Sequence, residues 1–262
     1  MKTRLTWNRA TEAALTALHL IDLTSLNDDD TDATIKALVR TAQTPVGTPA
    51  ALCIYPRFID AARAAMQACG LNLPIATVAN FPAGEATPEA AALEVSRAVE
   101  LGADEIDVVF PYRALMSGDP GAGHELVRQC RVAARNKCLK VILETGELKD
   151  TALIRQASEI AIEEGTDFIK TSTGKVAVNA TFAATADILA VIRQAGRTVG
   201  FKAAGGVRTA EEAAAYLNLV QWHMGSSYTV PATFRFGASG LLGNLLETLG
   251  HRANAMQSGS NY

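Results

Sequence analysis

The strongest constraint on the fold is a unit that recurs eight times along the 262 residues. In each unit a short apolar or β-branched run is followed by a polar turn and then by an Ala-rich amphipathic stretch. Corresponding points lie roughly 26 to 37 residues apart, which is the length of one strand–helix unit. The eight predicted strands are Leu18–Leu23, Ala51–Tyr55, Ile75–Ala79, Glu105–Phe110, Lys140–Leu143, Asp167–Lys170, Val199–Lys202 and Phe234–Gly237.

Strands this apolar are typical of a parallel sheet that helices cover on both faces. Eight of them, rather than five or six, favour a closed barrel over an open doubly wound sheet. We therefore predict an α/β fold of the (β/α)8 TIM-barrel type, with residues 1–262 forming a single domain. An extra N-terminal helix, roughly Trp7 to Leu18, is expected to close the barrel floor, and residues 253–262 are expected to form a flexible C-terminal tail.

Several of the intervening helices have recognisable beginnings. Asp30-Thr31-Asp32 and Thr87-Pro88 each place a capping residue before a helical stretch, and the second puts proline just inside the helix. Thr209 precedes Ala210-Glu211-Glu212, which is a capping-box pattern. These signals predict helices directly after three of the predicted strands.

Composition excludes several classes of protein. Apolar residues make up 48% of the chain and the formal net charge is −3, so the sequence predicts a globular protein that binds neither nucleic acid nor an anionic membrane. No stretch approaches the ~20 apolar residues of a membrane span, and no signal peptide is expected. The four cysteines have no CxxC spacing, which favours reduced thiols in a cytoplasmic protein.

Polar residues near the predicted strand ends are the candidates for chemistry, because barrels of this kind carry their active sites at the C-terminal ends of the strands. They are Asp22, Cys53 with Tyr55, Asn80, Asp107, Glu144, Lys170, Lys202 and Ser239. For any one of them, capping the next helix is about as plausible a role as catalysis.

Two lysines on adjacent predicted strands are the most informative pair. Lys170 and Lys202 lie inside strand-like runs, where lysine is a poor β-former and is costly to bury. Burial and a neighbouring like charge both disfavour an ammonium, so one of the two is expected to be a free amine near neutral pH. A free amine attacks a carbonyl to form a Schiff base, which requires no metal. Asp107 could hold a lysine and relay protons, or could form a purely structural ion pair.

Glycine-rich turns follow the sixth, seventh and eighth predicted strands. Loops seven and eight of these barrels, with a helix N-terminus, form the usual phosphate site, because glycine lets backbone N–H groups approach an anion. The residues predicted to bind phosphate or substrate are Gly174, Gly205, Gly206, Gly237 and Ser239, with Thr24, Thr171 and Lys175 as further candidates.

The sequence closely resembles the deoxyribose-phosphate aldolases of the longer bacterial type. The matching motifs are Ile21-Asp22-Leu23-Thr24, Leu26-Asn27-Asp28-Asp29-Asp30, Cys53-Ile54-Tyr55-Pro56-Arg57-Phe58, Asp104 through Arg113, Glu144-Thr145-Gly146-Glu147-Leu148, Phe168 through Gly174, Gly205-Gly206-Val207-Arg208-Thr209 and Phe236-Gly237-Ala238-Ser239. They extend over nearly the whole chain. The resemblance implies a class I aldolase that reversibly cleaves 2-deoxy-D-ribose 5-phosphate to acetaldehyde and D-glyceraldehyde 3-phosphate, without a cofactor or metal and as a homodimer.

The resemblance also assigns roles to single residues. It implies that Lys170 forms the Schiff base, that Lys202 is the neighbouring cation that lowers the pKa of that lysine, and that Asp107 relays protons. The terminal Tyr262, at the end of Ser258-Gly259-Ser260-Asn261-Tyr262, would assist proton transfer.

The chain departs from the family pattern at Ala203, where proline is expected, and at Gly240, where a second phosphate-loop serine is expected. The stretch from Trp222 to Thr233 matches poorly and is expected to alter the pocket rim or an oligomer contact. Cys53 could be a reactive thiol that traps unsaturated aldehydes, or simply a small buried hydrophobe.

Other functions fit the sequence less well. A metal-dependent aldolase needs a compact ligand set, but the histidines are scattered and Asp28-Asp29-Asp30 is more typical of a helix cap. A pyridoxal-phosphate enzyme also uses a lysine imine, yet the second lysine suits direct attack on a substrate. A non-catalytic sugar-phosphate sensor would be expected to lack Lys170 or Asp107. The same Schiff-base chemistry on another aldehyde or sugar phosphate is the remaining alternative.

Overall fold

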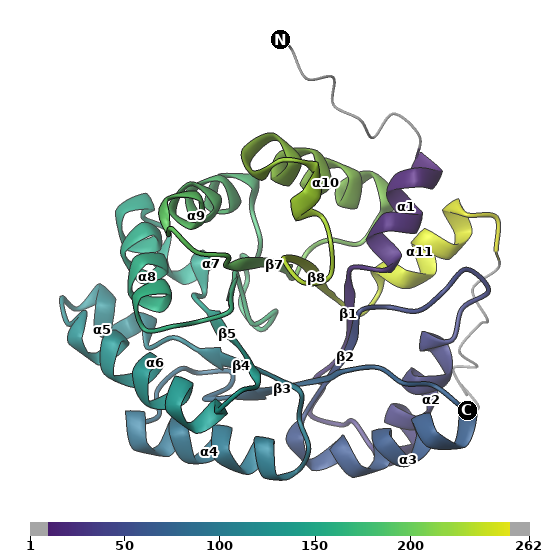
Figure 1. Ribbon diagram of the computed structural model, residues 1–262, viewed down its shortest axis with the longest axis horizontal. Helices are drawn as coiled ribbons and strands as arrows, with labels where there is room; N and C mark the ends of the chain where they lie inside the picture. The colour runs from purple at the N-terminus through teal and green to yellow at the C-terminus, as the bar shows by residue number, and fades with distance from the viewer. Residues whose placement is uncertain (1–9, 252–262) are drawn as a thin grey trace.

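The computed structural model describes residues 10–251 and shows a closed barrel of eight parallel strands in the order β1 to β8 (Figure 1). β1 pairs with both β2 and β8, which closes the ring. The prediction of a (β/α)8 barrel is therefore confirmed. The strands are β1 (Ile21–Ser25), β2 (Ala51–Ile54), β3 (Ile75–Ala79), β4 (Glu105–Val109), β5 (Cys138–Ile142), β6 (Phe168–Lys170), β7 (Gly200–Ala204) and β8 (Phe234–Ala238).

All eight predicted strands exist, and their bounds differ by a few residues. The first prediction began too early, because Leu18 ends a helix and β1 starts at Ile21. The fifth began too late, because β5 starts at Cys138 rather than at Lys140. This second difference matters for function, since it places Lys140 in the middle of a fully formed strand.

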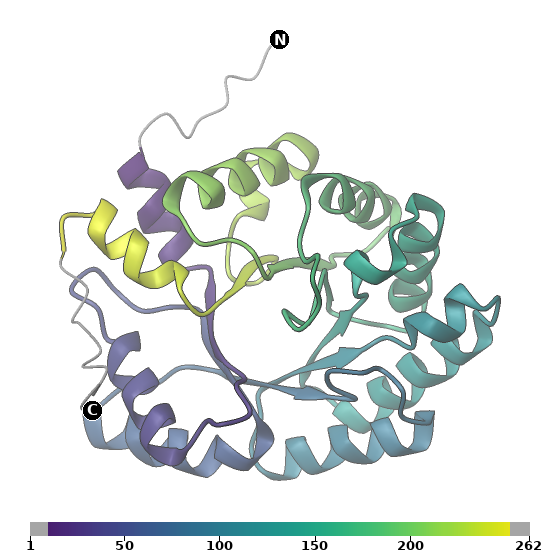
Figure 2. The same ribbon diagram turned by 180° about the vertical axis from the view of Figure 1, so that it is seen from behind.

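A ring of helices covers the outside of the barrel, as Figures 1 and 2 show from its two sides. Buried apolar residues fill the layer between strands and helices. The helices are α1 (Ala10–Leu18), α2 (Asp32–Ala42), α3 (Ile59–Cys69), α4 (Pro88–Glu100), α5 (Tyr112–Met116), α6 (Gly121–Ala134), α7 (Thr145–Leu148), α8 (Thr151–Glu163), α9 (Phe182–Gln194), α10 (Ala210–Met224) and α11 (Leu241–Thr248), with short 3₁₀ turns at η1 (Pro56–Phe58) and η2 (Ser226–Tyr228).

The predicted helix starts are confirmed. Thr31 and Thr209 form capping boxes at the beginnings of α2 and α10, and the Thr87 side chain accepts a hydrogen bond from the Ala90 amide at the start of α4. These caps satisfy backbone N–H groups that have no partner within the helix.

The extra N-terminal helix is present as α1, but its predicted position was wrong. It packs side by side with α10 and α11 in the outer layer (Figures 1 and 2) rather than closing the barrel floor. Ala13, Ala14, Ala17 and Leu18 form its buried face. The small alanines let the helix lie close to its neighbours, and Leu18 adds a large buried side chain, so its apolar stripe becomes part of the outer core.

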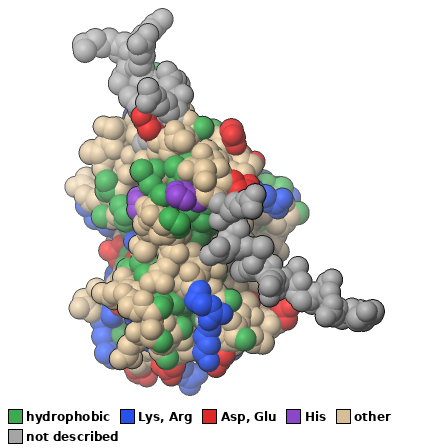
Figure 3. Space-filling view, turned by 90° about the vertical axis from the view of Figure 1, so that its right-hand side faces the viewer, with side chains coloured by type: hydrophobic (Ala, Val, Ile, Leu, Met, Phe, Trp, Pro, Cys, Tyr) green, Lys and Arg blue, Asp and Glu red, His purple; other side chains and the backbone are tan. Residues whose placement is uncertain are grey.

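The surface carries charges of both signs. Figure 3 shows basic and acidic side chains among hydrophobic and neutral ones on one face, without a broad basic area in the part that is visible. Among residues 10–251, no helix is both long and apolar enough to cross a membrane.

Candidate active site

A cavity of about 420 Å³ opens at the C-terminal ends of the strands. The loops that follow β1, β6, β7 and β8 form most of its wall. Its lining residues are Thr24, Ser25, Leu26, Asn27, Lys170, Thr173, Gly174, Lys175, Asn179, Ala204, Gly205, Gly206, Val207, Arg208, Gly237, Ala238, Ser239 and Gly240. This is the face on which TIM barrels carry out their chemistry.

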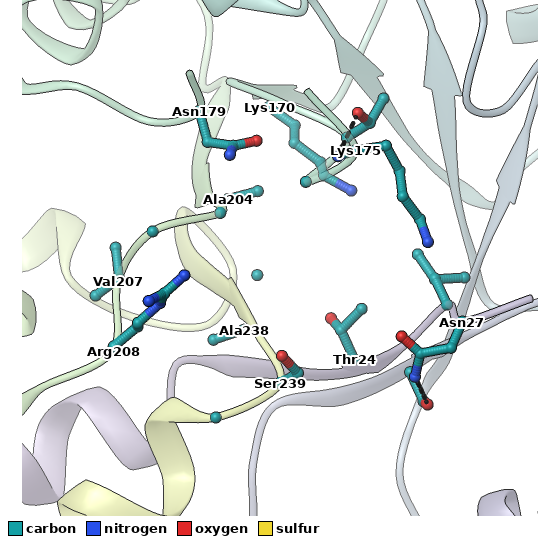
Figure 4. A pocket seen from close by; sticks show the side chains of 18 residues that line it. Thr24, Asn27, Lys170, Lys175, Asn179, Ala204, Val207, Arg208, Ala238 and Ser239 are labelled. Carbon is teal, nitrogen blue, oxygen red and sulfur yellow. Dashed lines mark hydrogen bonds between the residues drawn. The ribbon is translucent and has the colours of Figure 1, made fainter. Parts of the chain in front are cut away.

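Lys170 lies on the floor of this cavity. It is the last residue of β6 and is only 3% exposed, and its amino nitrogen points into the open space (Figure 4). Its Nζ donates a hydrogen bond to Asp107 Oδ2 at 2.9 Å. Lys170 is therefore both reachable from the cavity and held in place from below.

Lys202 is the register partner of Lys170 on the neighbouring strand, as the sequence predicted. It lies in the middle of β7, is fully buried, and does not line the cavity. Its Nζ donates to Asp107 Oδ2 at 2.8 Å and to Asp22 Oδ2 at 2.5 Å. Asp22 and Asp107 likewise lie within β1 and β4 rather than at their ends. Of these four residues, Lys170 alone stands at a strand end, so it is the one that a substrate can reach.

Three further charged residues of the barrel interior were missed in the sequence. The Nζ of Lys140 lies 2.6 Å from Glu105 Oε2 and 2.8 Å from Asp107 Oδ1. Arg235 pairs with Asp22 at 2.5 Å and with Glu105 at 3.0 Å. The sequence did contain a signal for Glu105. Successive side chains of a strand point to opposite faces, so Glu105 and Asp107, two residues apart, must both face the barrel interior.

The buried carboxylates and cations of this cluster stabilise one another in their charged forms. Burial by itself raises the pKa of Asp107 and Asp22, but the surrounding cations outweigh it and hold both pKa values below their usual range. Burial lowers the pKa of Lys202, but Asp107 and Asp22 outweigh it, so the pKa is raised. The pKa of Lys140 is raised in the same way. Lys202 and Lys140 are therefore ammonium ions at neutral pH.

These shifts predict a pH dependence of stability. Carboxylates with lowered pKa values stabilise the fold above about pH 4, and that contribution is lost as the pH falls toward their folded-state pKa values. Lysines with raised pKa values stabilise the fold below about pH 10, and that contribution is lost as the pH rises through their folded-state pKa values. Thermal melting followed by circular dichroism should show a plateau between these limits. A maximum confined to pH 4 or below would contradict the charged cluster.

Glycine-rich loops and basic side chains around the cavity can bind an anion. All five residues predicted for phosphate, Gly174, Gly205, Gly206, Gly237 and Ser239, line it, as do Thr24 and Lys175. Thr171 does not line it, because its hydroxyl donates to the Ala204 carbonyl at 3.2 Å and accepts from the Ala204 amide at 3.0 Å. Arg208 was not among the predicted site residues, yet Figure 4 shows Arg208 and Lys175 on opposite sides of the opening.

Glycine is required at two of these positions by the backbone and by close packing. Gly205 has a φ of +79°, which side-chain-bearing residues rarely adopt, and a Cβ there would lie 2.7 Å from Asn179. A Cβ on Gly237 would lie 3.0 Å from both Lys202 Cε and Ala204 Cβ. Gly237 therefore leaves room for the Lys202 side chain inside the barrel.

Glu144 organises the loop that carries Gly174 and Lys175. It is fully buried and adopts a left-handed conformation, with φ 58° and ψ 57°, directly after β5. Its carboxylate accepts from the Thr173 hydroxyl at 2.5 Å, and Thr173 in turn accepts from the Lys175 amide at 3.0 Å. Burial raises the pKa of Glu144. This contact fixes the wall of the cavity next to Lys170.

Asp30 organises the loop after β1, which forms another wall of the cavity. The expectation that Asp28-Asp29-Asp30 caps a helix was wrong for Asp30, because Thr31 is the cap of α2. Asp30 instead accepts hydrogen bonds from the Ser25 hydroxyl and from the Asn27 amide, at 2.8 and 3.0 Å. It thereby holds two residues that line the cavity.

The remaining predicted residues have varied positions. Cys53 is fully buried beneath the cavity in a small apolar cluster, and burial raises the pKa of its thiol, which disfavours the reactive thiolate. Ala203 packs in the outer core, and Gly240 lines the cavity with open space beside it. Tyr262 lies outside the described residues.

The poorly matching stretch from Trp222 to Thr233 does not form part of the pocket rim. None of its residues lines the cavity, and it leads into the beginning of β8, at the opposite end of the barrel. That part of the expectation was wrong. The structure contains one chain, so the expected oligomer contact stays a prediction.

Comparison with solved structures supports the same fold. An apo structure from Toxoplasma gondii ME49, provisionally assigned as a deoxyribose-phosphate aldolase, is 26% identical, with a TM-score of 0.84 over 92% of this chain and 97% of that one. A protein from Coccidioides immitis with the same provisional assignment is 28% identical, with a TM-score of 0.78 over 90% and 86%. The tetrameric deoxyribose phosphate aldolase from Aeropyrum pernix shares the fold at 24% identity, with a TM-score of 0.70 over 94% and 98%.

These similarities and the family match define the chain as an aldolase, that is, a lyase that acts on carbon–carbon bonds. The family model of the DeoC/LacD family aldolases matches residues 16–229, and the chain belongs to that family.

Proposed function

We propose that this aldolase reversibly cleaves 2-deoxy-D-ribose 5-phosphate to acetaldehyde and D-glyceraldehyde 3-phosphate through a Schiff base on Lys170. The observation that carries the proposal is the placement of Lys170. It reaches the cavity, whereas the neighbouring ammonium of Lys202 stays buried beneath it. The family and the similar structures supply the substrate class.

The chemistry follows from an amine at this position. The uncharged Lys170 Nζ attacks C1 of the open-chain sugar, and loss of water leaves an iminium ion. The C3 hydroxyl then loses its proton, the C2–C3 bond breaks, and its electron pair forms an enamine with the iminium. D-Glyceraldehyde 3-phosphate leaves, C2 takes up a proton, and water releases acetaldehyde. Asp107 touches both Lys170 and Lys202, so it can hold an ammonium and pass protons near the reacting nitrogen.

The rest of the cavity suits the phosphate. The N–H groups of the glycine-rich loops and the Ser239 hydroxyl can donate to phosphate oxygens, and Lys175 and Arg208 add positive charge. Figure 4 shows Arg208 and Ser239 across the opening from Lys170, which leaves room for a short sugar chain between the amine and the phosphate.

Reductive trapping tests the proposal. The enzyme is incubated with acetaldehyde and borohydride, and its peptides are analysed by mass spectrometry. We expect an ethyl adduct on Lys170 that is absent from Lys170→Leu. An adduct on Lys202 would exchange the roles of the two lysines, and a folded enzyme without an adduct on either would overturn the Schiff-base mechanism.

The choice of substrate has a separate test. Turnover of 2-deoxyribose 5-phosphate should exceed turnover of fructose 1,6-bisphosphate, since the proposed site takes a short chain with one phosphate. The opposite preference would favour the same imine chemistry on a longer ketose phosphate. An adduct with no aldol turnover of any sugar phosphate would favour a sensor.

Replacing Lys175 by methionine should impair only phosphorylated substrates. A hydrogen bond to a charged group contributes about 1.5–3 kcal/mol, so kcat/KM for 2-deoxyribose 5-phosphate should fall roughly 10- to 100-fold. Turnover of unphosphorylated 2-deoxyribose should change little, and Arg208→Met should behave alike. An equal loss on both sugars would show that Lys175 supports the loop rather than the phosphate.

A further inference from the structure

We propose that Arg235 is a positioning residue that sets the charge balance of the barrel interior and so keeps Lys170 available as an uncharged amine. This inference rests on the proposed Schiff-base function. Arg235 lies in β8, is 6% exposed, and does not line the cavity, so it cannot touch a substrate there. Its influence on Lys170 must pass through other side chains.

Arg235 is held on several sides. One guanidinium nitrogen donates to Asp22 Oδ1 at 2.5 Å, the other donates to Glu105 Oε1 at 3.0 Å, and Nε donates to the Pro231 carbonyl at 2.5 Å. The guanidinium also lies 5.8 Å from the centre of the Phe168 ring. Arginine suits this position because its planar fork is always charged and can engage two carboxylates at once.

A continuous chain of ion pairs leads from Arg235 to the reacting lysine. Asp22 accepts from Arg235 through one oxygen and from Lys202 through the other. Lys202 shares Asp107 Oδ2 with Lys170, at 2.8 and 2.9 Å. Each link joins groups that are almost fully buried, where charges are weakly screened.

Without Lys170, the buried cluster holds equal numbers of cations and carboxylates. Lys140, Lys202 and Arg235 are the three cations that match the three carboxylates Asp22, Glu105 and Asp107. A protonated Lys170 would add a fourth positive charge, and its carboxylate partner Asp107 is already shared with Lys140 and Lys202.

Other titratable groups near Lys170 do not supply a further anion within the cluster. Glu144 and Cys53 both interact electrostatically with Lys170, and burial raises the pKa of each. The Glu144 carboxylate is held by the amide and hydroxyl of Thr173, and no ion pair joins it to a lysine within residues 10–251. Lys175, on the cavity wall, would add positive charge. Unlike Lys140 and Lys202, Arg235 is not paired with Asp107, the carboxylate that Lys170 contacts, so its removal would leave an unmatched carboxylate without disturbing the partners of Asp107 directly. The extra negative charge would favour the ammonium form of Lys170.

Three variants test this charge balance through the pH midpoint of imine formation, which should rise in one, fall in the second and stay near the parent value in the third. In Arg235→Met the interior gains a net negative charge, so the pH midpoint of imine formation should rise by about one unit. In Glu105→Gln the interior gains a net positive charge, so the midpoint should fall by about as much. The double variant Glu105→Gln/Arg235→Met is balanced again and should return close to the parent midpoint.

The measurement is the rate of borohydride trapping with acetaldehyde from pH 5 to 10, together with the pH profile of kcat/KM. Arg155→Met serves as the matched control, because Arg155 pairs with Asp187 on the outer helices and should leave the midpoint unchanged. A role for Arg235 that is only structural would lower activity at every pH without moving the midpoint.

The outcomes separate the two proposals. If the parent enzyme shows no Lys170 adduct at any pH, the Schiff-base function itself fails. If adducts form but the midpoints of Arg235→Met and Glu105→Gln both equal that of the parent, the charge-balance inference fails and the mechanism stands. If Arg235→Met does not fold, the expected fall in Glu105→Gln still decides the matter.

Discussion

Replacing Lys170 by leucine should reduce turnover of 2-deoxyribose 5-phosphate by a factor on the order of 10⁵, because the covalent route through the imine disappears. Leucine approximately preserves the packing of the lysine stem. Since Asp107 is also paired with Lys140 and Lys202, removal of the Lys170 amino group should leave the fold intact. The measurement is a coupled assay of D-glyceraldehyde 3-phosphate release.

Lys36→Leu is the control for this experiment, because Lys36 is exposed on α2 and distant from the cavity. It should retain parental turnover. Residual activity in Lys170→Leu above about 1% of the parent would contradict the assignment. Such activity would show that another amine forms the imine or that the reaction proceeds without one.

Replacing Asp107 by asparagine should damage both stability and activity. Asp107 accepts from Lys140, Lys170 and Lys202, and all four residues are buried. Removing its charge leaves buried ammonium groups without their common partner, which typically costs about 3–5 kcal/mol in the free energy of unfolding. Denaturant unfolding measures the loss, and activity should fall by a factor on the order of 10³ or more because proton transfer at the imine is also impaired.

Asp104→Asn provides the comparison for Asp107→Asn. Asp104 is a half-exposed carboxylate near the start of the same strand, where it pairs with Arg63 and Lys137. Exposed and half-exposed pairs contribute about 1 kcal/mol or less, so this variant should be only mildly destabilised and nearly fully active. Equal effects at the two positions would mean that burial of the Asp107 cluster is not what makes it important.

The alternation of strand and helix signals was enough to predict the barrel. Each strand of a (β/α)8 barrel is a local apolar run, and each following helix begins at a local cap, so the sequence carries both signals directly. Lys170 and Lys202 could be paired from the sequence because consecutive strands are neighbours in such a barrel. The glycine loops could be placed for the same reason.

Lys140 and Arg235 could not be assigned to the site in this way. Each forms one ion pair with a strand that is not its neighbour in the barrel, namely Lys140 with Asp22 and Arg235 with Glu105, and these pairs cross the barrel interior. Arg235 on β8 meets Glu105 on β4, 130 residues away. The position of α1 escaped prediction similarly, because an amphipathic helix shows which face is buried but not which neighbour buries it.

The sequence by itself therefore determined the barrel, the order of its strands, and the pairing of two lysines at adjacent positions, because each of these depends on local periodicity and chain order. The tertiary structure alone decided which lysine faces the cavity and which carboxylate balances which cation. The physical reason is that closing the sheet brings distant strands within hydrogen-bond distance across a poorly screened interior.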